Sequence, residues 1–137
     1  MTPALSSPDN ARTSQEAVAQ TLRDMYAALA VDDMMRFKSI VTDDFYAFDA
    51  GRRFEGVALA QLVIDAHKAG RQFAWTVNDP DVRIHGDSAW IAYVNTGSVG
   101  DALKATLVTW LESAMLRFEY GRWRIAFFHS SRAQPPV

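Results

Sequence analysis

Apolar side chains recur every three to four residues through the first half of the chain, a spacing that predicts helices. Thr13 opens the first helix, and Glu16 follows at the spacing of a capping box. Asp32 or Asp33 is expected to cap the next one. The expected elements, in order, are a helix over 14–30, a shorter helix that carries Met34, Phe37, Ile40 and Val41 and ends at Asp43-Asp44, a strand over 45–49 with a turn at 50–52, and a helix over 57–69 that stops at Gly70.

After Gly70 the apolar positions alternate with polar ones, which is the spacing of β-strands. Helices followed by strands in meander order predict an α+β fold with three N-terminal helices and a mainly antiparallel sheet. The expected elements of this half are strands around 73–77, 82–84 and 90–94 with a hairpin turn at 85–88, a long strand over 104–119, a turn at 120–122 and a last strand over 123–131.

Both faces of the final hairpin are rich in apolar side chains. Strict alternation puts Trp123, Ile125, Phe127 and His129 on one face of the last strand and Arg124, Ala126, Phe128 and Ser130 on the other, while Trp110, Glu112, Ala114 and Leu116 share the inner face of its neighbour. The helices cover only one face of the sheet, so the convex face is expected to meet a second copy of the chain. A homodimer is therefore predicted, and the alternative is that the tails or a neighbouring molecule in a crystal cover this face.

Composition narrows the class of protein. The 137 residues fit one domain, and the absence of cysteine excludes disulfides, a thiol nucleophile and cysteine-based metal sites. A net charge of −2 argues against a nucleic-acid partner. The sequence has no apolar run of about 18 residues, so a membrane partner is not expected. It also lacks the features of a secretory signal, so a cytoplasmic location is expected. One domain is expected over 13–132, between a disordered lead (1–12) and a loose tail (133–137).

Three segments resemble the nuclear transport factor 2-like superfamily, which includes ketosteroid isomerases, SnoaL-like polyketide cyclases and the association domain of calcium/calmodulin-dependent kinase. They are 25–45 (MYAALAVDDMMRFKSIVTDDF), 48–56 (FDAGRRFEG) and 110–132 (WLESAMLRFEYGRWRIAFFHSSR). The resemblance implies a cone, in which a curved sheet curls around the helices and leaves a pocket at the open end. The same fold carries isomerases, cyclases, dehydratases and binding modules, so it specifies chemistry poorly.

The resemblance to the ketosteroid isomerases extends to single positions. In those enzymes a carboxylate at the end of the strand after the second helix removes a proton beside the substrate carbonyl, and Asp49 stands at that position. Their oxyanion hole consists of a tyrosine and a protonated carboxylic acid. The corresponding positions here are Met25 and Ala114, with Tyr26 one residue away. The base is therefore retained, but both oxyanion donors are replaced. Because these donors are missing, steroid isomerase activity is not expected.

Two carboxylates are candidates for chemistry. One hypothesis is that Asp49 is a general base whose pKa is raised by apolar side chains around it. The alternative is that its side chain hydrogen-bonds the backbone of its own Asp-Ala-Gly turn. Glu112 lies on the inner face of its strand, where a charge needs a partner. Arg124 on the adjoining strand is the expected partner, and the alternative is that Glu112 is a catalytic acid.

The histidines and aromatic residues complete the picture. His129 is expected on the convex face as an interface residue rather than a catalyst, and no histidines have ligand spacing, so no metal is expected. Aromatic side chains from several elements fill the core or line a pocket for an apolar ligand. The predicted catalytic residues are Asp49, Tyr26 and Glu112, and the predicted ligand-binding residues are Phe37, Phe48, Trp75, Trp110, Arg124 and Phe128.

Two functions follow from these features. The first is an enzyme that isomerises, cyclises or dehydrates a small organic molecule through an enol, with no cofactor. The second is a non-catalytic ligand-binding or oligomerisation module.

Overall fold

A computed structural model describes residues 8–134 of the chain. Most of the two predicted tails, residues 1–7 and 135–137, therefore lies outside the described residues. Within the predicted lead, Pro8–Thr13 form a short helix, α1, instead of a disordered segment. The indole N–H of Trp123 donates to the carbonyl oxygen of Ala11 at 2.8 Å, which ties this helix to the last strand.

The predicted helices are present, with shifted ends. Helix α2 (Gln15–Ala30) begins at Ser14, whose hydroxyl oxygen accepts from the backbone N–H of Ala17 at 3.1 Å. The predicted cap, Thr13, is wrong by one residue, because Thr13 ends α1. Helix α3 (Met34–Ile40) begins at Asp33, as one of the two expected caps, and α4 spans Ala58–Lys68.

Helix α3 ends at Ile40, earlier than the predicted end at Asp43-Asp44, and these two residues lie inside strand β1. The cause is a residue distant in sequence: the guanidinium of Arg124 donates to the carbonyl oxygens of Lys38 and Val41 at the end of α3. A cation that satisfies terminal carbonyls stabilises a helix end. The chain therefore turns directly from α3 into the first strand.

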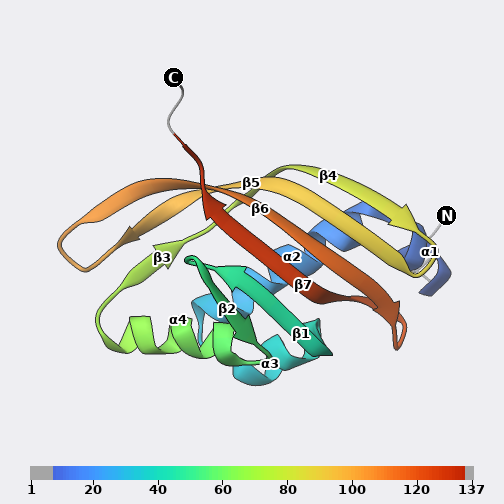
Figure 1. The fold of residues 1–137 in the computed structure, drawn as a ribbon, viewed down its shortest axis with the longest axis horizontal. Helices are drawn as coiled ribbons and strands as arrows, with labels where there is room; N and C mark the ends of the chain where they lie inside the picture. The colour runs from blue at the N-terminus through green and yellow to red at the C-terminus, as the bar shows by residue number, and fades with distance from the viewer. Residues whose placement is uncertain (1–7, 135–137) are drawn as a thin grey trace, which may run out of the picture.

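Seven strands form one strongly curled sheet, as Figure 1 shows. Their order is β2-β1-β7-β6-β5-β3, with β4 paired to β5; only β1 and β7 are parallel. The predicted α+β fold with a mainly antiparallel sheet is confirmed. The strands are β1 (Val41–Asp49), β2 (Arg52–Glu55), β3 (Gln72–Ala74), β4 (Val77–His85), β5 (Ser88–Gly100), β6 (Ala105–Glu119) and β7 (Arg122–Arg132).

The inner face of the sheet and the apolar faces of the helices form the core. Helix α2 runs along this face, and α4 lies beside β2 and α2 (Figure 1). The largest fully buried side chains are Leu22, Met25, Phe37, Phe45, Ile91, Leu116 and Ile125. Their positions explain the helical spacing of the first half of the sequence and the alternation of the second.

A β-bulge at Ala126 changes which side chains of β7 face inward. The partner of Met115 on β6 is Phe127, whereas the partner of Leu116 is Ile125, so Ala126 is an extra residue. Strict alternation is therefore the wrong rule for this strand. The buried inner set is Trp123, Ile125, Phe128 and Ser130, and Phe127 and His129 lie on the outer face.

Candidate functional site

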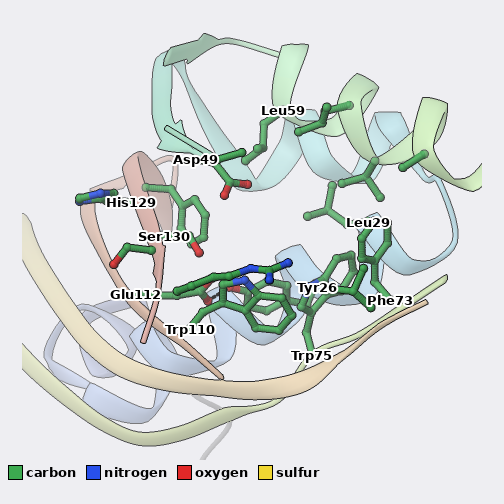
Figure 2. A pocket seen from close by; sticks show the side chains of 18 of the residues that line it. Tyr26, Leu29, Asp49, Leu59, Phe73, Trp75, Trp110, Glu112, His129 and Ser130 are labelled. Atoms are coloured by element: carbon green, nitrogen blue, oxygen red, sulfur yellow. Dashed lines mark hydrogen bonds between the residues drawn. The ribbon is translucent and has the colours of Figure 1, made fainter. Parts of the chain in front are cut away.

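A cavity of about 590 Å³ opens between the inner face of the sheet and helices α2 and α4. Figure 2 shows side chains from both layers directed into it. Most of the wall is apolar, and the polar groups are few. The apolar lining includes Met25, Leu29, Leu59, Leu62, Val63, Phe73, Trp75, Val99, Trp110 and Phe128. A concave apolar chamber with a few polar groups is the usual form of a small-molecule site.

Asp49 lies at the end of β1, and its carboxylate points into the cavity (Figure 2). The pKa of Asp49 is raised from 3.8 to about 6, mainly by burial and secondly by the negative charge of Glu112, while a hydrogen bond from the backbone of Ala50 and the charge of His129 act in the opposite direction. Both sequence interpretations of Asp49 describe part of its surroundings, because it contacts its own turn and also lines the cavity.

This shift in pKa predicts a pH dependence of stability. The folded protein keeps the proton of Asp49 up to about pH 6, whereas the unfolded chain loses it near 3.8, so ionisation of Asp49 destabilises the fold as the pH rises. Relative to Asp49→Asn, the wild-type protein is expected to lose about 1–3 kcal/mol of unfolding free energy between about pH 4 and pH 7. Urea denaturation of both proteins across this range measures the difference, and parallel curves would contradict it.

Across the cavity from Asp49 lies a hydrogen-bonded cluster of four buried side chains, Tyr26, Tyr93, Asn95 and Glu112 (Figure 2 labels Tyr26 and Glu112). The hydroxyl of Tyr26 donates to Glu112 Oε1 and lies 2.8 Å from the hydroxyl of Tyr93. Asn95 Nδ2 donates to the same carboxylate oxygen at 3.0 Å, and its Oδ1 accepts from the backbone N–H of Thr76 at 2.9 Å. Hydrogen bonds from neutral donors therefore hold Glu112.

Burial raises the pKa of both tyrosines well above the ordinary value, and the charge of Glu112 adds to the rise in each case. Tyr26 and Tyr93 therefore keep their protons throughout the physiological range. The cluster provides phenolic O–H groups beside the cavity.

The predicted ion pair between Glu112 and Arg124 is absent. Glu112 is opposite Ser130 on β7, six residues along the strand from Arg124, a separation of roughly 20 Å. Arg124 instead pairs with Glu119 at 2.8 Å and caps α3. The register of the hairpin, which the sequence interpretation did not follow residue by residue, decides this outcome.

The cluster leads to a prediction for Tyr26→Phe. The variant keeps the ring but leaves the buried Glu112 with one donor fewer, so the unfolding free energy is expected to fall by about 1–3 kcal/mol. Chemical denaturation measures the change. Tyr120→Phe is the matched control, because Tyr120 is exposed in the β6–β7 turn. Equal stability of the two variants would contradict the contribution of the cluster.

The structure brings together six of the nine predicted site residues. They are Tyr26, Asp49, Trp75, Trp110, Glu112 and Phe128. Phe37 does not line the cavity; it is buried in the core, with its ring centroid 5.8 Å from that of Phe45. Phe48 points to the outer face because Asp49, its neighbour on β1, points inward. Arg124 lies at the end of α3, away from the cavity.

His129 is at the rim. Its ring is directed away from the cavity (Figure 2) and packs against Phe48 on the outer face, with centroids 5.9 Å apart. The residue also contributes to the lining of the cavity. The ring of His129 therefore lies on the convex face, as expected.

Several lining residues were not predicted. Leu59, Leu62, Val63 and Ala66 form one face of α4, and its helical spacing was the available signal. Arg71 follows α4, and Arg132 ends β7; no motif marks either of them. Within residues 8–134, no group of three or more histidine, aspartate or glutamate side chains is arranged to hold a metal ion.

Sequence comparison identifies the family. Residues 18–135 match the SnoaL-like domain, which is most of the chain. The chain belongs to the SnoaL-like domain family. No curated protein matches it at a significant level. None of the helices in the part of the chain described by the structure is long and apolar enough to cross a bilayer.

Solved structures show the same fold at low sequence identity. A putative dehydratase of the NTF2-like family from Streptomyces avermitilis is 15% identical with a TM-score of 0.75, over 88% of this chain and 96% of that one. The association domain of C. elegans CaMKII is 22% identical with a TM-score of 0.74, over 90% and 98%. A ketosteroid isomerase-like protein from Erwinia carotovora atroseptica is 19% identical with a TM-score of 0.70, over 88% and 96%. The nuclear transport factor 2-like cone is thereby confirmed.

Proposed function

We propose that this SnoaL-like protein binds a small organic carbonyl compound in the cavity and transfers a proton at the carbon next to the carbonyl. The observation that carries the proposal is the carboxylate of Asp49, half-buried in an apolar chamber with its pKa raised to about 6. A base in this range is ionised at neutral pH and still strong enough to take a proton from carbon. The reaction class is isomerisation, cyclisation or dehydration through an enol.

Tyr26 and Glu112 are the polar partners in this proposal. Proton removal by Asp49 leaves negative charge on the substrate oxygen, which needs a hydrogen-bond donor. Tyr26 keeps its proton and lies across the cavity from Asp49 (Figure 2). Its O–H is donated to Glu112 in the free protein and turns to the substrate oxygen in the complex, while Asn95 continues to donate to Glu112. A substrate that spans the cavity therefore places its oxygen near the phenol and its acidic carbon near the carboxylate.

Proton exchange tests the proposal without knowledge of the natural substrate. Aryl-alkyl ketones are incubated with the protein in D₂O, and the loss of the α-proton signals is followed by NMR. The protein is expected to accelerate exchange for the ketones that fit the cavity. No acceleration across the panel, with binding retained, would favour a non-catalytic ligand-binding module.

A second proposal concerns assembly: the chain forms a homodimer through an outer patch, defined as Tyr46, Phe48, Trp90, Leu111, Met115 and Phe127. Side chains of adjacent strands align across this patch, since Met115 is opposite both Trp90 and Phe127, and Phe127 is opposite Tyr46. Leu111 and Met115 are 53% and 44% exposed. An apolar patch that extends over four strands is typical of a subunit contact. The likeness to an association domain is consistent with this role.

A further inference from the structure

Two arginines at the cavity have side chains without a partner among residues 8–134. Arg71 follows the end of α4, and Arg132 is the last residue of β7, directly opposite Trp110 on β6. Both line the cavity and both are exposed. Among the described residues, neither guanidinium makes a hydrogen bond, an ion pair or a contact with an aromatic ring.

The other arginines of the described chain are mostly paired. Seven form ion pairs with carboxylates: Arg12, Arg23, Arg36, Arg53, Arg83, Arg117 and Arg124. The two cavity arginines stay unpaired although Asp49 and Glu112 line the same chamber. The charges that act on Asp49 are those of Glu112 and His129, and neither arginine contributes. Among the described residues, neither guanidinium therefore reaches a carboxylate oxygen of Asp49 or Glu112 within ion-pair distance.

This separation defines the shape of a ligand. A guanidinium presents N–H donors in a planar fork that matches the two oxygens of a carboxylate. Phe73, Trp75 and Trp110 form the aromatic wall of the same cavity, and the rings of Phe73 and Trp75 stack with centroids 5.3 Å apart. A flat apolar body against this wall, with an anionic group toward the arginines, leaves the rest of the molecule free to reach Asp49.

We infer that Arg71 and Arg132 bind a carboxylate of the ligand, so that the substrate class is small aromatic carbonyl compounds that also carry a carboxylate. The inference rests on the proposed function, in which Asp49 is the base. It adds the orientation of the substrate, whose carboxylate faces the arginines.

A pair of probes of equal size tests the inference by calorimetry: 3-phenylpropanoate and its neutral amide, 3-phenylpropanamide. The acid is expected to bind the wild-type protein at least about tenfold more tightly than the amide. Added salt is expected to lower the affinity for the acid and to leave the affinity for the amide unchanged. Arg71→Gln and Arg132→Gln are each expected to lower the affinity for the acid about tenfold and to leave that for the amide unchanged. Arg122→Gln is the matched control, with the same loss of charge on β7 outside this cavity.

The outcomes separate the two proposals. Equal binding of the acid and the amide, or an acid affinity that survives both substitutions, would overturn the carboxylate site and leave the apolar pocket intact. Binding of neither probe would overturn the pocket itself and the inference with it. Because both arginine side chains are exposed and make no bonds in the described structure, the variants are expected to fold, and circular dichroism checks this.

Discussion

An Asp49→Asn variant is expected to exchange the α-protons of ketone substrates at least about 100-fold more slowly than the wild-type protein. The amide has nearly the same shape as the carboxyl group, so the cavity and its affinity for a ketone are retained while the base is lost. The measurement is the NMR exchange assay in D₂O, with ligand binding measured in parallel. Loss of the rate with retention of binding identifies Asp49 as the base.

Asp43→Asn provides the control for this experiment. Asp43 lies on the same strand, β1, but is exposed and outside the cavity, so its substitution removes one negative charge without touching the site. The control is expected to keep the wild-type exchange rate. An Asp49→Asn variant that exchanges as fast as Asp43→Asn would contradict the role of Asp49.

A Leu111→Glu, Met115→Glu double variant is expected to convert the proposed homodimer into monomers of 15.3 kDa. Both side chains are exposed on β6 in the outer patch, and neither contacts the cavity. In a dimer they would be covered by the partner, where an unpaired carboxylate is costly. Loss of central apolar contacts at an interface typically weakens association 30-fold or more, roughly 2 kcal/mol per residue. Sedimentation velocity at micromolar concentration measures the mass.

Leu103→Glu is the control for assembly. Leu103 is also an exposed leucine, but it lies in the turn between β5 and β6, outside the outer patch. It is expected to leave the dimer intact. A wild-type protein that sediments as a monomer would refute the dimer directly.

The fold was predictable because it depends on local patterns. The helical spacing of apolar residues located α2, α3 and α4, and the alternation after Gly70 located the strands. The end of α3 was missed because Arg124, more than eighty residues away in sequence, caps it. The faces of β7 were missed because a single extra residue, Ala126, reverses the alternation midway.

The candidate site was predictable only where a motif or a resemblance marked a position. Asp49, Tyr26 and Glu112 line the cavity as expected, but the partners of Glu112 depend on strand register and not on charge. The sequence favours Arg124 as the partner of a buried glutamate, whereas the fold provides Tyr26 and Asn95. Arg71 and Arg132 lie at the ends of elements, where no periodicity constrains the residue type.

The bulge at Ala126 links the two surfaces of the sheet. Deletion of this one residue would turn Phe127 and His129 toward the cavity and place Phe128 and Ser130 on the outer face. Insertions and deletions in β7 are therefore expected to alter ligand choice and subunit assembly together, and homologues that differ in length here are expected to differ in both.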